Sequence, residues 1–200
     1  MNYWIIITLQ ILLFFEGGKA TSAEQVPSDY VPVAAPIDTD SAGKGGEIAQ
    51  SSVVRVICPK DNSSGTGFLH KSERIITAHH VVSGCSEILV IDSKAVAIKA
   101  SLLAGNLDLD LAILSTEHGI KAKALPISTR DGKQLAIGTQ VSTWGYPGGY
   151  DGFAPILTVG YLSGLQAFKT KSGRIVTQWI VNAAFNRGNS GGPVIHIETV

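Results

Sequence analysis

The sequence lacks an excess of charge of either sign. Its 200 residues carry 16 Lys and Arg against 16 Asp and Glu, which gives a formal net charge of zero. This balance gives no indication of a nucleic acid partner or of an acidic substrate, because binding either one selects for basic surface. Only 16% of the residues are charged, which argues against a disordered chain or a coiled coil. The length fits one ordinary domain or two small lobes that share an interface.

The sequence also lacks an apolar run long enough for a comfortable membrane span. Residues 3–15 are almost wholly apolar, but a spanning helix needs about 20 such residues. The small residues that follow fit a signal-peptidase site, so we predict a signal peptide over residues 1–20, with cleavage after Ala20 or Ala23. No Lys or Arg precedes the run, which leaves an uncleaved N-terminal anchor as the alternative. Either way we expect a secreted or periplasmic protein, with no stable membrane span after cleavage.

Cysteine is scarce, and Cys58 and Cys85 are the only two. In an exported protein an even pair favours a disulfide bond, here closing a segment that contains His79 and His80. Two free buried thiols are the alternative. The sequence has no Cys-x-x-Cys motif, no histidines at ligand spacing and no acidic calcium loop. We therefore expect neither a metal site nor a cofactor.

The composition divides the chain into three regions. Residues 21–50 are rich in Ser, Ala, Pro, Gly, Asp and Lys without apolar periodicity, which predicts a flexible leader or pro-segment. From residue 51, short apolar runs with many β-branched residues are broken by turn residues about every eight to twelve positions. This spacing predicts an all-β sandwich or a pair of barrels. The polar stretch 126–133 is the expected linker between a first barrel at about 51–125 and a second at 134–200.

Nine apolar runs are predicted to be strands. They are Val53–Cys58, Thr66–His70, Arg74–Thr77, Ile88–Ile91, Ala95–Leu103, Leu111–Ser115, Gln140–Gly145, Leu157–Leu165 and Ile175–Asn182. Residues Ala78–Gly84 are expected to form a single helical turn, and Pro193–Ile197 can begin a further strand.

A glycine-rich stretch from Asn186 to Pro193 surrounds Ser190, with one glycine two residues before it and two directly after it. Glycine lets backbone amides approach a ligand closely, because no Cβ blocks them. Such a turn can present the Ser190 hydroxyl as a nucleophile. It can also direct the amides of Gly188 and Ser190 toward a developing oxyanion. The alternative is a glycine-rich turn with a merely polar serine.

A serine nucleophile needs a base, and the base needs a third group that fixes its tautomer. The stretch Ile75–Val82 supplies two histidines after a predicted strand, and Asn106–Leu114 brings aspartate into an apolar run. A partly buried carboxylate demands a partner, and an imidazole N–H is a suitable one. The order His, Asp, Ser with flanking glycines favours a hydrolase more than any one motif does alone.

These motifs resemble those of the trypsin-like serine peptidases, in particular the Do/HtrA type. The resemblance extends from Val53 to Val194 and includes Gly65–Phe68, Ile76–Val82, Asp110–Leu114, Gly145–Gly148, Thr158–Ser163 and Asn182–Pro193. It implies two perpendicular six-stranded β-barrels with the active site between them. It also implies a serine endopeptidase that acts on protein or peptide substrates.

The resemblance assigns the base and the acid. In the pattern Thr-Ala-x-His the base is His80, and His79 takes a position usually held by a small residue. In the pattern Asp-(Ile/Leu)-Ala-x-Leu the orienting acid is Asp110. Asp108 lies two residues earlier, on the same face of a strand, and is the alternative.

The resemblance also assigns the nucleophile and a substrate pocket. Ser190 is the nucleophile, and the amides of Gly188 and Ser190 form the oxyanion hole. Ala184, six residues before the serine, takes the position at the bottom of the pocket. It carries no negative charge, so we expect no preference for Lys or Arg but a small or aliphatic one. Phe185 is expected to line the pocket, with ordinary core packing as the alternative.

The sequence departs from the family pattern after Ser190, because Val200 follows only ten residues later. Relatives continue with strands that complete the second barrel, and many carry a PDZ module. We therefore expect an incomplete second barrel and leave oligomer formation open. An alternative function is a catalytically impaired, protease-like protein that binds peptides or partners. A third is a β-rich structural module with a chance motif.

Overall fold

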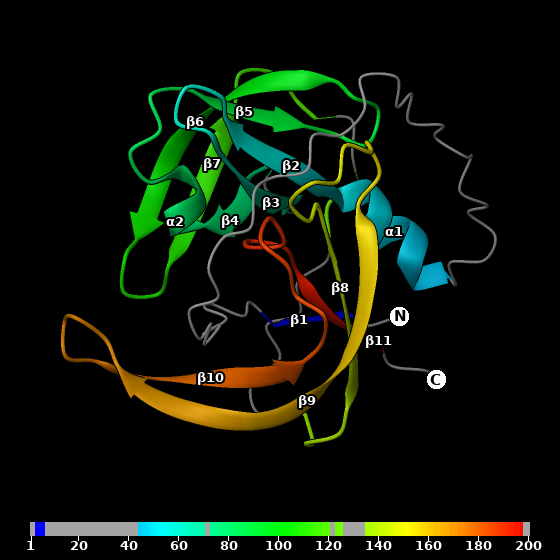
Figure 1. The fold of residues 1–200 in the computed structure, drawn as a ribbon, viewed down its shortest axis with the longest axis vertical. Coiled ribbons are helices and arrows are strands. Elements are labelled where there is room, and N and C mark those ends of the chain that lie inside the picture. The colour runs from blue at the N-terminus through cyan, green and yellow to red at the C-terminus, as the bar shows by residue number, and fades with distance from the viewer. Residues whose placement is uncertain (1–2, 7–43, 71–72, 121–122, 126–134, 198–200) are drawn as a thin grey trace, which may run out of the picture.

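The computed structural model describes residues 3–6, 44–70, 73–120, 123–125 and 135–197. The regular structure of these residues is mostly β-strand and forms two units (Figure 1). One unit is a closed barrel in the order β2-β3-β4-β7-β6-β5, and the other is an open sheet in the order β1-β11-β8-β9-β10. The predicted fold class, an all-β protein with an incomplete second barrel, is confirmed. The predicted linker at 126–133 lies outside the described residues.

The closed barrel contains six antiparallel strands and one short helix. The strands are β2 (Val53–Cys58), β3 (Ser63–Leu69), β4 (Ile75–Ala78), β5 (Ile88–Ile91), β6 (Ala97–Asn106) and β7 (Leu111–Thr116), and helix α2 (His79–Val82) follows β4. Side chains alternate along β2, so that Val54, Val56 and Cys58 point into the barrel core. Val81 and Val82 of α2 belong to the same core, which fixes the helix on the barrel.

The open sheet contains β8 (Gln140–Gly145), β9 (Ile156–Lys169), β10 (Ile175–Asn182), β11 (Val194–Ile197) and β1 (Tyr3–Ile6). Its own core is small and centres on Val141, Leu162 and Val194. Strand β9 is the longest, and the β9–β10 hairpin curves along the sheet until its tip lies near the α2 side of the barrel (Figure 1). Several large apolar side chains of β9 and β10 stay exposed on this sheet.

Two elements depart from the expected N-terminal organisation. Strand β1 lies within the predicted signal peptide and pairs antiparallel with β11. Helix α1 (Lys44–Ser52) begins inside the stretch 21–50 that was expected to be a flexible leader. Ala49 of this helix is buried against Val53 and Phe68, so the folded domain begins before residue 51. Leader residues up to 43 and both predicted cleavage positions lie outside the described residues.

A shared core joins the two units. It combines Ala49 of α1 with Val53 and Phe68 of the barrel, and with Trp144 and Ile195 of the open sheet. Burying apolar side chains from both units in one cluster favours a fixed arrangement of the two. None of the helices in the described part has the length and apolar character that crossing a bilayer requires.

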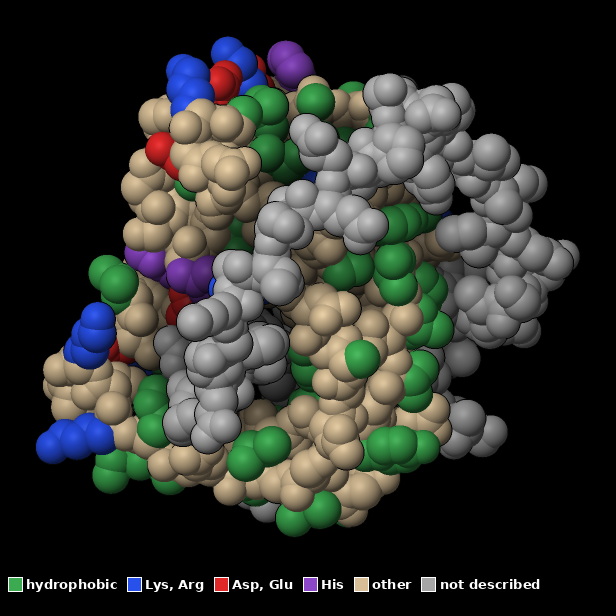
Figure 2. Space-filling view, viewed as in Figure 1, with side chains coloured by type: hydrophobic (Ala, Val, Ile, Leu, Met, Phe, Trp, Pro, Cys, Tyr) green, Lys and Arg blue, Asp and Glu red, His purple; other side chains and the backbone are tan. Residues whose placement is uncertain are grey.

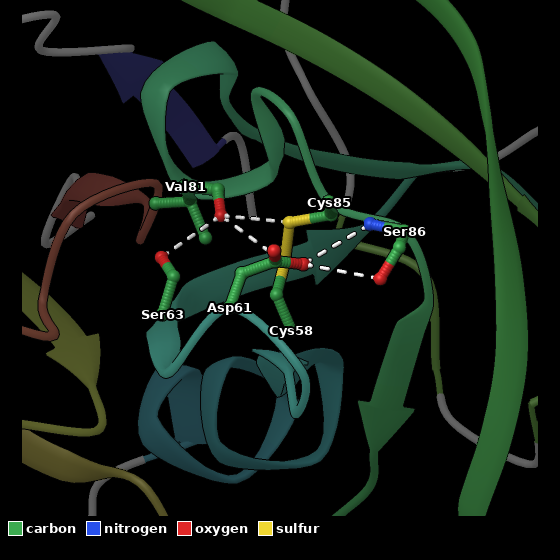
Figure 3. The surroundings of a disulfide bond; sticks show 6 residues. All are labelled: Cys58, Asp61, Ser63, Val81, Cys85 and Ser86. Atoms are coloured by element: carbon green, nitrogen blue, oxygen red, sulfur yellow. Dashed lines mark hydrogen bonds between the residues drawn. A yellow bond between two sulfur atoms is a disulfide. The ribbon is translucent and has the colours of Figure 1, made fainter.

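The predicted disulfide bond between Cys58 and Cys85 is present. Figure 3 shows that it ties the end of β2 to the residues that follow α2. Beside it, the Ser63 hydroxyl donates to the carbonyl of Val81, and the Asp61 carboxylate accepts the amide of Ser86 at 3.0 Å. The disulfide bond and these hydrogen bonds therefore anchor the short helix that carries the two histidines.

Candidate active site

His80 and Asp110 are in direct contact. The ring Nδ1 of His80 lies 2.6 Å from Oδ2 of Asp110, and the backbone amide of His80 donates to Oδ1 of the same carboxylate at 2.7 Å. The amide of His79 donates to the backbone carbonyl of Asp110 at 2.9 Å. These three contacts fix α2 on the turn that carries Asp110.

The backbone of the turn suits this role. Asp110 is only 6% exposed and adopts φ of +48°, a left-handed conformation that aspartate tolerates better than most residues. The turn begins at Asn106, whose side chain accepts the amide of Leu109 at 2.9 Å. Strand β7 begins directly afterwards at Leu111. An apolar strand thus draws the carboxylate inward, and the turn directs it at the histidine.

The contact with Asp110 determines the protonation of His80. Because the acceptor is a carboxylate, Nδ1 carries the proton and Nε2 is left as the free acceptor of the neutral ring. The hydrogen bond that the ring donates to Asp110 raises the pKa of His80 above its ordinary value of 6.5. Partial burial of the ring lowers the pKa, and the negative charge of Asp110 raises it further.

The other two candidates at this edge, His79 and Asp108, line the same cavity as His80 but make different contacts. His79 packs close to β6, where a Cβ added at Gly105 would lie 2.7 Å from its Cδ2. Asp108 contacts the tip of the β9–β10 hairpin, where its Oδ1 accepts the amide of Ser172 at 3.3 Å. Of the two aspartates, Asp110 is therefore the one that the structure brings to His80.

Ser190 lies in a turn that depends on glycine. Gly188 and Gly191 have φ of +93° and +86°, which residues with a side chain rarely adopt. A Cβ at Gly188 would lie 2.3 Å from the Tyr146 carbonyl oxygen, and one at Gly191 would lie 2.2 Å from that of Thr66. The turn is thus packed against both units with no room for a side chain at either position.

The amides of Gly188 and Ser190 are oriented by the carbonyl groups that precede them. The Arg187 carbonyl accepts the amide of Gly148 at 2.5 Å, and the Asn189 carbonyl accepts the amide of Gly192 at 3.0 Å. No peptide bond in the described part is cis, so each N–H points opposite to the carbonyl of its own peptide plane. Within the described residues, neither amide donates to an acceptor of the protein.

One cavity of about 720 Å³ brings these residues together. Among the residues that line it are His80, Asp110 and Ser190. Gly188 is buried directly behind its wall, between Arg187 and Asn189, which do line the cavity. In Figure 2 histidine side chains lie at the boundary between the barrel and the β9–β10 hairpin, apart from a further histidine at the upper edge, and Lys and Arg side chains lie on the hairpin below that boundary. Within the described structure no hydrogen bond joins Ser190 to His80.

The two predicted pocket residues have different positions. Phe185 lines the cavity, whereas Ala184 is exposed and does not line it. The reason is that Ala183 faces β9, where a Cβ added at Gly160 would lie 2.5 Å from its Cβ, so the next side chain turns away. The placement of Ala184 at the bottom of the pocket is thus not supported by the geometry.

The site also has parts that the sequence did not indicate. The hairpin residues Phe168–Lys171 line the cavity opposite α2, and Thr66 and Gly148 hold the loop around Ser190 from outside it. The local signals for these two residues were the motifs Gly65–Phe68 and Gly145–Gly148, which belong to the family resemblance but had no assigned role. The hairpin carries no such signal.

The closed barrel and the open sheet both contribute residues to one cavity. This arrangement is that of a known class of proteins, the two-barrel peptidases. The family profile described as "Trypsin-like peptidase domain" matches residues 65–199, and the chain belongs to that family. Among solved structures, the fold is similar to that of the Rv3671c protease from M. tuberculosis in its active form, with a TM-score of 0.64 and 24% identity over 88% of this chain and 79% of that one. It is also similar to Deg5, with a TM-score of 0.60 and 27% identity over 74% and 75% of the two chains.

Curated relatives of the chain carry Do-like or DegP-like names. It is 34% identical over 136 residues to "Protease Do-like 1, chloroplastic" of Arabidopsis thaliana, covering 66% of this chain and 30% of that protein. It is 32% identical over 139 residues to "Probable periplasmic serine endoprotease DegP-like" of Halomonas elongata, covering 68% and 27%. A third relative, "Serine protease Do-like HtrA" of Bacillus subtilis, is 32% identical over 148 residues, covering 69% and 32%. The chain thus spans about a third of the length of these relatives.

Proposed function

We propose that this chain is a serine endopeptidase that cleaves peptide bonds through an acyl-enzyme. The observation that carries the proposal is the contact between His80 and Asp110 in the cavity that Ser190 also lines. Membership of the trypsin-like peptidase family supports the same reaction, and the curated relatives are named serine proteases.

In the proposed mechanism, His80 is the general base. Its Nε2 takes the proton of the Ser190 hydroxyl as the serine oxygen attacks the peptide carbonyl, and Asp110 stabilises the imidazolium that forms. His80 then gives the proton to the leaving amine. Water repeats the sequence on the acyl-enzyme. We assign the orienting role to Asp110 and not to Asp108, because only Asp110 contacts the ring.

The amides of Gly188 and Ser190 would form the oxyanion hole. Both N–H groups lack an acceptor within the described residues, and the carbonyls before them are held by other amides. Donors that are already oriented cost no reorganisation when charge develops on the substrate oxygen. Removing one such donor typically lowers the rate by about 10²–10³.

The charge of the cavity bears on the substrate. Three cationic side chains line it (Lys169, Lys171 and Arg187) together with two carboxylates, Asp108 and Asp110, of which Asp110 is paired with His80. The cations are therefore in excess, and a substrate side chain of Lys or Arg would be repelled. We therefore propose substrates with a small or aliphatic residue, and not Lys or Arg, before the scissile bond.

We also propose an exported location. The relatives named as periplasmic and the disulfide bond, which persists in oxidising compartments, support a secreted or periplasmic protein. The signal peptide at residues 1–20 stays part of this proposal.

Labelling with a fluorophosphonate tests the proposed function. The chain is expressed with its own N-terminus in an exporting host, and the labelling rate is compared with those of Ser190→Ala and His80→Ala. We expect labelling of the parent chain and none in either variant. A folded parent chain that stays unlabelled would refute the proposed peptidase activity and leave the peptide-binding alternative. Isothermal titration of the protein with a peptide then tests that alternative.

A further inference from the structure

Thr66 of β3 connects the closed barrel to the loop around Ser190. Its side chain is fully buried, at 0% exposure. The hydroxyl donates to the carbonyl of Gly188 at 2.7 Å and accepts the amide of Tyr146 at 3.0 Å. Both hydrogen-bonding functions of the hydroxyl are thus used by residues of the second unit.

The backbone of Thr66 reaches the same loop. Its amide donates to the carbonyl of Ser190 at 2.8 Å, and its carbonyl accepts the Thr77 hydroxyl at 2.7 Å. One residue of the barrel therefore holds the carbonyls of both Gly188 and Ser190. These are the two residues whose amides form the proposed oxyanion hole.

The conformation of Gly188 explains why a second restraint matters. Glycine at φ of +93° has no side chain to limit its rotation, so only contacts of the two adjoining peptide planes fix it. Gly148 holds the plane before Gly188 through the Arg187 carbonyl. The plane after Gly188 is held by the Thr66 hydroxyl and by the Asn189 amide, which donates to the Asn186 carbonyl at 3.1 Å. Without the hydroxyl, the peptide after Gly188 keeps only the contact of the Asn189 amide with the Asn186 carbonyl, so the segment between the two proposed oxyanion amides is held less firmly.

Packing alone does not call for a hydroxyl at this position. Gly65 and Gly67 flank it with no spare room, since an added Cβ would lie 2.6 Å from Val81 or 2.8 Å from Ile75. A fully buried strand position favours an apolar β-branched residue such as valine, which has the same shape as threonine. The polar group is therefore explained by the partners that it holds.

We propose that Thr66 is a positioning residue for the oxyanion hole: its hydroxyl helps to hold the Gly188–Asn189 peptide, which lies between the peptide that carries the Gly188 amide and the peptide that carries the Ser190 amide. The proposal rests on the proposed peptidase function. It predicts that the hydroxyl acts on the transition state, where charge develops on the substrate oxygen, and not on substrate binding.

The experiment compares Thr66→Val, which keeps the shape, with Thr66→Ser, which keeps the hydroxyl. We expect Thr66→Val to lower kcat about 10- to 100-fold, somewhat less than the loss of an oxyanion donor, with KM nearly unchanged. The affinity for a peptide aldehyde, which forms a tetrahedral adduct, should fall in parallel, while the affinity for the product peptide should not. Thr66→Ser should restore kcat even though it loses the buried methyl group.

Ser52→Ala is the matched control. Ser52 is also fully buried, and its hydroxyl donates to the carbonyls of Ile48 and Lys123, away from the cavity. This variant should lose stability but keep kcat. Circular dichroism on every variant separates unfolding from a catalytic defect.

Each outcome has one interpretation. An active parent chain with a folded Thr66→Val variant of normal kcat would overturn the positioning role and leave the peptidase proposal intact. A parent chain without activity would overturn both. If Thr66→Val does not fold, the kcat of Thr66→Ser decides whether the hydroxyl is responsible. A folded Thr66→Ser variant with kcat lowered tenfold or more would assign the effect to the methyl group and overturn the proposal. Normal kcat in that variant supports the hydroxyl.

Discussion

At the scale of single residues, the carboxylate of Asp110 makes two contacts that position the proposed base. One carboxylate oxygen accepts a hydrogen bond from the ring Nδ1 of His80, and the other accepts one from its backbone amide. The same group therefore sets both the orientation of the ring and the position of α2. Asp108, two residues earlier, instead holds the hairpin through the amide of Ser172. The two aspartates thus offer a direct comparison of otherwise similar substitutions.

Asp110→Asn should lower the rate of fluorophosphonate labelling by about 10⁴, because an amide in place of the carboxylate favours the wrong tautomer of the base. Asp108→Asn is the matched control and should stay near the parent rate, since its contact is made with the hairpin and not with His80. The measurement is the second-order labelling rate of all three proteins. Equal losses in the two variants would contradict the assignment of Asp110.

The raised pKa of His80 gives opposite trends in stability and activity with pH. The folded state binds the proton more tightly than the unfolded state, whose value is near 6.5. The stabilisation is therefore complete below that value and is lost as pH rises through the raised folded-state pKa. Labelling needs the neutral ring, so its rate increases over the same window.

An NMR titration of His80 with a pH profile of labelling measures both effects. The two midpoints should agree and lie above 6.5, and Asp110→Asn should shift them to lower pH. His79→Gln serves as the control and should leave the profile in place. A parent midpoint at or below the ordinary histidine value would show that the contact with Asp110 is not formed in solution.

At the scale of elements, strand positions were predictable where a short apolar run is bounded by turn residues. The bounds of Val53–Cys58, Ile88–Ile91, Gln140–Gly145 and Ile175–Asn182 agree with the prediction. Strand β9 is longer at both ends than the predicted Leu157–Leu165, because its last residues pair with β10 across the hairpin. Such pairing depends on the partner strand and is not visible in the local pattern.

The elements at the N-terminus were not predictable for a related reason. Helix α1 has two glycines and no apolar period, and the buried position of Ala49 arises from packing against Val53 and Phe68. The residues of the candidate site also divide into those that a local motif predicted and those that only long-range contacts reveal. His80, Asp110 and Ser190 stand in local motifs, whereas the hydrogen bond from Thr66 to Gly188 joins residues 122 positions apart.

Removing the disulfide bond tests what anchors α2. Cys58 and Cys85 are 27 residues apart, and closing a loop of that length stabilises a protein by about 3–4 kcal/mol in the chain-entropy model. The double variant Cys58→Ala, Cys85→Ala should lose about that much unfolding free energy in urea. Reducing agent should destabilise the parent chain and have no effect on the variant. A parent protein that is insensitive to reducing agent would contradict the prediction.

At the scale of the whole molecule, the site depends on how the two units meet. The histidine and the aspartate belong to the barrel, and Ser190 belongs to the loop that leads into β11. The shared core of Val53, Phe68, Trp144 and others joins the units behind the cavity. Relative motion of the units would change the distance between base and nucleophile, so contacts across the seam matter for activity as well as for stability.

Arg55 is one such contact. It leaves the outer face of β2, and its guanidinium donates to the carbonyls of Tyr150 and Gly152 in the second unit. The same group lies 4.9 Å from the ring centre of Tyr146. The loop that it holds contains Gly148, whose amide fixes the Arg187 carbonyl beside the proposed oxyanion hole. A substitution at Arg55 should therefore act on the active site from a distance.

Arg55→Lys keeps the charge but loses the planar fork that reaches two carbonyls and stacks on the ring. Hydrogen bonds from charged donors contribute about 1.5–3 kcal/mol each, so we expect a loss of about 2 kcal/mol. For a domain of this size, that corresponds to a Tm lower by about 4–8 °C. The labelling rate should fall as well, because the loop around Gly148 becomes less fixed. Arg174→Lys, at an exposed position next to the hairpin tip, is the matched control and should change neither quantity. An unchanged Tm in Arg55→Lys would mean that the shared core alone holds the two units together.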